Sequence, residues 1–290
     1  MSYWNIQRPF NQDKAIVGSI YFNAEASVNV SSDNVGYDQY GKKSVPAGLF
    51  LAKVAGVDRF LPADYVRETA VATTSTQVKV NMPEVFKVGD VLYATEPEGL
   101  ITAAATWSAG DTATIRFSEP SLGIDVSYTH TQVGANLAAL DDEIVAALNS
   151  SSNPLAKYAR FEVGTAGQIK VFSKGLVFTI SVSSNTAGDG TLVATTQLVD
   201  TPRLIGTISA IDFANRTITL GANAAVAVSV GGHIGTLVEQ VYGLYNHSVD
   251  FTDRPVQTLK AIDRADRVYS VALPYLNGRL VAQFPRIKFI

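Results

Sequence analysis

Short apolar alternations in steps of two residues recur along this chain, and they constrain its fold more than any other feature. Ala113, Ile115 and Phe117 alternate with polar residues, and so do Ile180 and Val182. A period of two places such side chains on one face of a half-buried β-strand. Gly, Asn and Asp separate many of these stretches and favour tight turns. The sequence therefore predicts a mainly β protein.

Two β-rich blocks flank the middle of the chain. The first begins at Val45-Pro-Ala-Gly and continues through residues 76–82 and 86–93, and the second covers residues 204–233. Strand, tight turn, strand and Gly turn make up a β-meander. We interpret residues 45–103 and 201–290 as two parts of one barrel-like or sandwich-like body. Within the second part, Asp253-Arg-Pro255 precedes Val256, Leu259 and Ile262 at helical spacing, which predicts a helix.

Residues 104–200 have a different character and predict an inserted α+β domain. Several strands occur here, together with one window of helical periodicity. A helix from 133 to 149 would place on one face Val133, Leu137, Leu140, Ile144 and Leu148. Ser and Asn residues followed by Pro154 then end the helix, because proline disfavours helical conformation in the residue before it.

Residues 1–44 show neither period for long and combine polar residues with many aromatic ones. Disordered segments are usually poor in aromatics, so an extended arm that contacts another subunit would explain the combination. The alternative is a pair of ordinary strands and a loop packed on the chain's own core. The candidate capsid or subunit contacts are the arm aromatics Tyr3, Trp4, Phe10, Tyr21, Phe22, Tyr37 and Tyr40.

Composition excludes several classes of function. The net charge is −3 and Lys and Arg do not cluster, so the sequence predicts no nucleic-acid partner. The chain has no cysteine, which excludes disulfides, thiolate metal sites and cysteine nucleophiles. No segment approaches the roughly 18 consecutive apolar residues of a membrane helix, and no signal peptide is recognisable. We therefore expect a protein that stays in the cytoplasm until it joins an assembly.

Groups that could carry chemistry are few. His130, His233 and His247 are the only histidines, and none has a partner at metal-ligand spacing. Asp141-Asp142-Glu143 are adjacent on the expected helix, so their carboxylates point in different directions. Asp189 lies in a Gly-rich turn that lacks the full calcium-loop pattern. Phosphate-binding loops and nucleophile elbows are also absent. The sequence predicts no catalytic residue, no metal site and no cofactor, and hence a protein that is not an enzyme.

Three stretches together resemble the head decoration, or cement, proteins of tailed bacteriophages. A polar arm precedes Val45-Pro-Ala-Gly-Leu-Phe-Leu-Ala-Lys-Val54, and residues 86–93 together with 205–220 are similar to the entry strand and hairpin of their small β-barrels. The 104–200 insert resembles an α+β module of phage structural proteins. Many decoration proteins are far shorter than this chain.

The resemblance implies a structural protein of the virion that assembles in the host cytoplasm. It would bind the exterior of the capsid, with the major capsid protein and its own copies as partners, often as trimers, and would bridge neighbouring capsomers. Two alternatives remain within structural proteins. One is a carbohydrate-binding fibre or adhesin module, which the β-richness and twelve tyrosines permit. The other is the major capsid subunit, although no window supplies its long spine helix.

Overall fold

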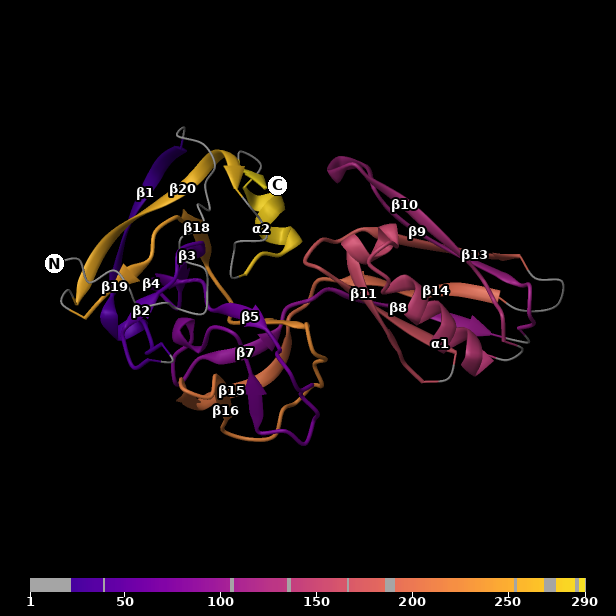
Figure 1. Ribbon diagram of the computed structural model, residues 1–290, viewed down its shortest axis with the longest axis horizontal. Helices are drawn as coiled ribbons and strands as arrows, with labels where there is room; N and C mark the ends of the chain where they lie inside the picture. The colour runs from indigo at the N-terminus through magenta and orange to yellow at the C-terminus, as the bar shows by residue number, and fades with distance from the viewer. Residues whose placement is uncertain are drawn as a thin grey trace. The chain divides into compact units, whose positions relative to one another are not determined.

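The computed structural model describes residues 22–38, 40–104, 107–134, 137–165, 167–185, 191–252, 255–268, 275–284 and 287–289. As the sequence predicted, the protein is mainly β and built of several antiparallel sheets, one of which forms a half-barrel (Figure 1). The chain divides into two compact units. Unit 1 comprises Met1–Ala94, Arg203–Leu276 and Gln283–Ile290, and unit 2 comprises Thr95–Pro202 and Asn277–Ala282.

The strands of unit 1 come from both ends of the chain. They are β1 (Phe22–Ser31), β2 (Ser44–Val45), β3 (Leu49–Val54), β4 (Val57–Phe60), β5 (Ala63–Tyr65), β6 (Gln77–Lys79), β7 (Val91–Ala94), β15 (Arg203–Asp212), β16 (Thr217–Leu220), β17 (His233–Gly235), β18 (Gln240–Tyr245), β19 (Val249–Asp250), β20 (Val256–Val268) and β21 (Ile287–Phe289). Two 3-10 turns, η1 (Ser32–Asn34) and η2 (Pro83–Val85), accompany them, whereas the helix α2 (Gly278–Gln283) belongs to unit 2 except for its last residue.

Two larger sheets form the body of unit 1. One has the order β1-β20-β18-β3-β4, with β21 paired to β20, and the other has the order β5-β17-β7-β15-β16-β6. A short β2–β19 pair is separate from both. The core includes Phe50 and Leu51 of β3 with Leu244 of β18, all essentially without exposure to solvent. Strands far apart in sequence thus complete one apolar interior.

The arm expected over residues 1–44 does not include residues 22–31 and 44–45, which are strands, and its residues 1–21 lie outside the described residues. Residues 22–31 form β1, which pairs antiparallel with β20, and Figure 1 shows the two strands side by side. Val28 and Val30 of β1 are buried. β2 pairs with β19 at Val45 and Val249. The alternative of ordinary strands therefore holds for residues 22–31 and 44–45, because their backbone groups and apolar side chains find partners in the body.

The helix expected after Pro255 is instead a long strand. β20 spans Val256–Val268 and pairs with β1 on one side. Within it, Leu259 and Ala261 are buried and are two residues apart. A spacing of three residues also fits Val256, Leu259 and Ile262, so local periodicity misled the assignment. Pairing with β1 decides the structure, because tertiary contacts override local preference.

The strands of unit 2 form two sheets. Their elements are β8 (Glu98–Ala104), β9 (Thr112–Glu119), β10 (Ile124–Thr131), β11 (Ala159–Val163), β12 (Gln168–Ser173), β13 (Thr179–Asn185) and β14 (Thr191–Val199), with the helix α1 (Leu137–Leu148) and the 3-10 turns η3 (Pro120–Leu122) and η4 (Pro154–Lys157). One sheet has the order β10-β9-β13 and the other β11-β12-β8-β14. Phe117 of β9 stacks on Phe161 of β11, with ring centroids 6.0 Å apart, so the sheets enclose one core.

The helix expected near residues 133–149 is confirmed in its position, with a later start. α1 begins at Leu137, and Val133 is 79% exposed in the loop before it. Ile144 and Leu148 are buried in the core of unit 2, as their spacing predicted. The sequence analysis began the insert at residue 104, whereas β8 pairs with β12 and β14 and thus belongs to unit 2.

Candidate interaction surface

A short loop between η1 and β2 presents two exposed tyrosines, and we call residues 35–38 and 40–43 the tyrosine loop. Asp38 organises it, since Oδ1 accepts hydrogen bonds from the backbone N–H groups of Tyr40 and Lys42, both at 2.9 Å. Oδ2 accepts a hydrogen bond from the hydroxyl of Ser44 at 2.9 Å. The N–H of Asp38 also donates to the carbonyl of Lys42 at 2.7 Å. An aspartate that bonds the backbone ahead of it in this way stabilises a tight turn.

Tyr37 and Tyr40 are 47% and 51% exposed. The ring of Tyr37 meets the ring of Phe213 edge to face, with centroids 5.9 Å apart and an interplanar angle of 73°. The ammonium group of Lys43 lies 5.5 Å from the centroid of the Tyr37 ring. Tyr37 is thus held in place while half of its surface faces solvent. Such rigid aromatic side chains supply contact area at low entropic cost.

The base of the tyrosine loop is fixed to unit 1 at several points. The N–H of Gly36 donates to the carbonyl of Glu84 at 2.8 Å. A Cβ atom at Gly36 would overlap the ring of Phe213, so a larger residue there would displace that ring. The ammonium group of Lys43 donates to the carbonyl of Ser32 at 3.0 Å. These contacts anchor the loop at both of its ends.

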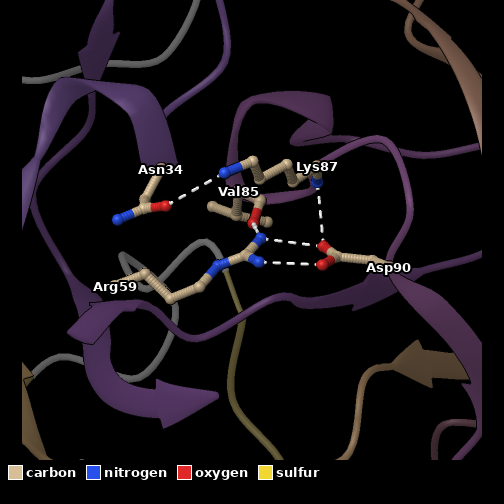
Figure 2. A network of polar contacts seen from close by, with 5 residues as sticks. All are labelled: Asn34, Arg59, Val85, Lys87 and Asp90. Atoms are coloured by element: carbon tan, nitrogen blue, oxygen red, sulfur yellow. Dashed lines mark hydrogen bonds and ion pairs between the residues drawn. The ribbon is translucent and has the colours of Figure 1, made fainter. Parts of the chain in front are cut away.

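A buried ion pair, Arg59–Asp90, lies near this anchor. Figure 2 shows the two side chains pointing toward one another, with Val85, Lys87 and Asn34 beside them. Arg59 of β4 donates to both carboxylate oxygens of Asp90, at 2.9 and 2.8 Å, and to the carbonyl of Val85 at 2.6 Å. The N–H of Lys87 donates to Asp90 at 2.8 Å, and the ammonium group of Lys87 donates to Asn34 at 3.3 Å. The Arg59–Asp90 network therefore ties β4 to the turn before β7 and to η1, which leads into the tyrosine loop.

Two buried carboxyl groups lie in the same unit. Asp64 accepts hydrogen bonds from the N–H groups of Asn81 and Met82, both at 2.6 Å, and of Tyr65 at 2.8 Å. Burial raises the pKa of Asp64 to about 6 despite these donors. Burial likewise raises the pKa of Glu84 to about 7, with a further contribution from the nearby charge of Asp64. Both groups therefore change charge within the range from mildly acidic to neutral pH.

The other polar groups singled out from the sequence have packing or capping contacts. His233 packs against Tyr65, with ring centroids 4.8 Å apart. Asp64 and Tyr65 are consecutive residues of β5, so their side chains point to opposite faces of the sheet, and Asp64 therefore lies on the face away from this ring pair. His130 Nε2 lies 3.5 Å from Glu143. Glu143 accepts hydrogen bonds from the N–H groups of Val133 and Gly134, which lower its pKa.

Two further groups complete the set. His247 is exposed beside Tyr245. Asp189 lies outside the described residues. Among the residues that the structure describes, no group of three or more His, Asp and Glu could hold a metal ion. None of the described helices is long and apolar enough to cross a membrane.

Of the seven aromatic residues expected at contacts, the structure brings two together. Tyr37 and Tyr40 share the tyrosine loop, whereas Phe22 begins β1 and its side chain is outside what is described. Tyr3, Trp4, Phe10 and Tyr21 lie outside the described residues. Phe213 was not expected at this surface. It lies in the turn in which Asp212 accepts a hydrogen bond from the N–H of Asn215 at 2.9 Å, and no sequence pattern places this turn beside Tyr37.

Comparisons with protein-family models, with curated proteins and with solved structures returned no match for this chain. The function is therefore argued from the residues themselves.

Proposed function

We propose that this chain is a structural protein of a virus particle that binds the outer surface of the capsid lattice and stabilises neighbouring capsomers. The observation that carries the proposal is the tyrosine loop. Tyr37 and Tyr40 are half exposed on a turn that Asp38 organises and that Gly36 and Lys43 anchor. Exposed aromatics on a rigid support are the residues in which binding energy concentrates at protein interfaces.

The charges around the tyrosines favour a protein surface as the partner. Lys42 and Lys43 lie in the loop itself, Lys87 lies next to η1, and Asp38 is occupied by its hydrogen bonds to the backbone. A few cations beside aromatic rings suit a partner surface with acidic groups, and they would orient the docking rather than supply most of the affinity. The aromatic residues would supply the main contact.

The first residues of the chain are the second element of the proposal. Tyr3, Trp4 and Phe10 precede β1 in sequence, and β1 is held in the body by β20. A tethered segment with aromatic anchors adds a second contact whose effective concentration is set by the tether. Two contacts per chain would let one copy reach two neighbouring capsomers. The major capsid protein and further copies of this chain are the proposed partners.

Co-sedimentation with capsid shells tests the proposal. Shells of the virus whose genome encodes this chain, prepared without it, are mixed with the full chain or with the double variant Tyr37→Ala/Tyr40→Ala. We expect occupancy of the shells by the full chain and at least roughly tenfold weaker binding by the variant, since buried interface tyrosines each contribute more than about 1 kcal/mol.

The matched control truncates two exposed apolar side chains of unit 2, Leu122→Ala/Val133→Ala, and should bind like the unaltered chain. Equal binding by the tyrosine variant would remove the loop from the interface. Failure of the unaltered chain to bind any shell would refute the function itself.

A further inference from the structure

Two edge strands of unit 2 are closed by side-chain amides. At the edge of β11, the N–H of Phe161 donates to Asn149 Oδ1 at 3.0 Å, and Asn149 Nδ2 donates to the carbonyl of Phe161 at 2.8 Å. At the edge of β13, the N–H of Ile180 donates to Gln197 Oε1 at 2.8 Å, and Gln197 Nε2 donates to the carbonyl of Ile180 at 2.9 Å. Each amide takes the place of a neighbouring strand, which protects an edge from pairing with another chain.

Of the two remaining edge strands, β14 supplies the Gln197 side chain that bonds β13, whereas β10 has no such closure by a described side chain. The β10–β9 register shows which backbone groups of β10 face outward. The N–H of Gln132, directly after β10, donates to the carbonyl of Asp111 in the direction of β9 at 2.9 Å. The β10–β9 register has no bulge. The direction of the backbone N–H and C=O groups alternates along a strand. The backbone groups of Tyr128 therefore also point toward β9, and those of Ser127 and Thr129 point away from it.

The opposite side of the same sheet gives this result independently. Ile180 directs its N–H and C=O to Gln197, hence away from β9. Its partner Phe117 must then direct its own groups toward β10, where it pairs with Val126. Val126 and Tyr128 therefore both face β9. Both derivations leave the same four residues facing outward, namely Asp125, Ser127, Thr129 and Thr131.

The outward edge of β10 is suited to accept another strand. All four outward residues have exposed side chains, and their backbone groups make no hydrogen bond to any described residue along that edge. The strand contains no proline, glycine or lysine that would discourage pairing. Figure 1 shows β10 at the border of its sheet, with β9 on its inner side.

We propose that β10 pairs antiparallel with β10 of a second copy of this chain, about a twofold axis at Tyr128. In this register Ser127 lies opposite Thr129 of the second copy, and Asp125 lies opposite Thr131 of the second copy. The outward N–H and C=O groups of both strands then satisfy one another. The two three-stranded sheets would become one continuous sheet of six strands.

Charge and apolar contacts favour a second copy as the occupant. Asp125 is the only charged residue among the four on the outward edge, and this register keeps the two copies of it apart. A register that placed them opposite one another would be destabilised by repulsion. On the core side, the half-buried Val126 and Tyr128 would gain cover from His130 and Tyr128 of the second copy. The inference goes beyond the proposed function and does not depend on it.

Sedimentation velocity of the full chain over a wide concentration range tests the inference, with two matched variants that differ at one residue. Ser127→Glu/Thr129→Glu places Glu opposite Glu across the axis, twice. Ser127→Glu/Thr129→Lys places Glu opposite Lys, twice. Position 127 lies beside Arg116 on β9, so a glutamate is tolerated there in both variants.

We expect the unaltered chain to form a dimer and the Glu/Glu variant to raise its dissociation constant by roughly tenfold or more, because like charges directly opposite each other are destabilising. The Glu/Lys variant should dimerise at least as well as the unaltered chain. Circular dichroism of both variants checks that the fold is kept. A monomer at every concentration, a trimer, or equal behaviour of the two variants would overturn the pairing. Shell binding without dimerisation would overturn the pairing and leave the proposed function standing.

Discussion

Removal of the Asp90 carboxylate is expected to lower the free energy of unfolding of unit 1 strongly, because it leaves a buried guanidinium group without its counter-charge. Asp90 receives two hydrogen bonds from Arg59, whose side chain is 4% exposed, and one from the N–H of Lys87. In Asp90→Ala the guanidinium group stays buried beside the carbonyl of Val85 with no counter-charge. Removing one partner of a buried ion pair costs about 3–5 kcal/mol.

The chain contains a matched control for this change. Arg116 and Asp125 also form a pair with two hydrogen bonds, at 2.7 and 2.9 Å, but their side chains are 53% and 65% exposed. Water screens such a pair and solvates the remaining charge when one partner is removed. Asp125→Ala should therefore leave the free energy of unfolding almost unchanged. The comparison tests burial, because each pair has two hydrogen bonds of similar length, through Nη1 and Nη2 of Arg59 and through Nε and Nη2 of Arg116, while the exposure of the two pairs differs widely.

Denaturant unfolding followed by circular dichroism measures both variants. Trp107 is buried in unit 2 and Trp4 is the only other tryptophan, so fluorescence in a Trp4→Phe background follows unit 2. We expect Asp90→Ala to lower the stability of unit 1 and to leave the Trp107 transition in place. Arg59→Met/Asp90→Leu should recover part of the loss, because it removes both charges. If Asp90→Ala is as harmless as Asp125→Ala, the reasoning from burial is refuted.

Two further predictions concern pH and the N-terminus. Because burial raises the pKa of Glu84 to about 7 and that of Asp64 to about 6, the folded state holds their protons more tightly than the unfolded chain. This stabilisation is full below their unfolded pKa values and is lost as pH rises through the folded ones, so stability should fall from about pH 5 to about pH 8, and Glu84→Gln should reduce the fall by about 2 kcal/mol. A pH profile of urea unfolding measures this, and an unchanged slope in the variant would contradict it. Deletion of residues 1–21 should leave the melting temperature nearly unaltered and weaken shell binding, whereas deletion of residues 1–40 also removes β1, exposes the edge of β20 and should lower the melting temperature sharply. Equal melting of the two truncated chains would contradict the place given to β1.

Periodicity in the sequence was sufficient to identify much of unit 2. Ile115 and Phe117 in β9 and Ile180 in β13 face the core as their alternation predicted. The alternation is informative because each of these strands has one face exposed to solvent and one face buried in the core. Ile144 and Leu148 were placed on the buried face of α1 for the same reason, at the helical period.

Contacts between distant segments could not be read from the sequence. The strand β20 was assigned to a helix because its partner β1 is more than two hundred residues earlier in the chain. Residues 22–31 were assigned to the expected arm and not to a strand, because the alternation that includes Val28 and Val30 is brief. The pairing of Arg59 with Asp90 depends on where β4 and the turn before β7 meet. These contacts join segments that are distant in the sequence, so no local sequence pattern predicts them.

The tyrosine loop shows the same division. Tyr37 and Tyr40 were expected at contacts from composition alone, while the support that Asp38, Gly36 and Phe213 give them follows from the fold. The sequence analysis named Tyr37 and Tyr40 among seven candidate contact residues, and the structure shows that these two are exposed and how their loop is held.

Electron cryomicroscopy of purified shells, with and without the full chain, tests the central claim most directly. The account predicts ordered additional density on the outer surface, repeated with the capsid lattice and spanning neighbouring capsomers, with the tyrosine loop in contact with the shell. Identical maps with and without the chain, or density only inside the shell, would contradict it.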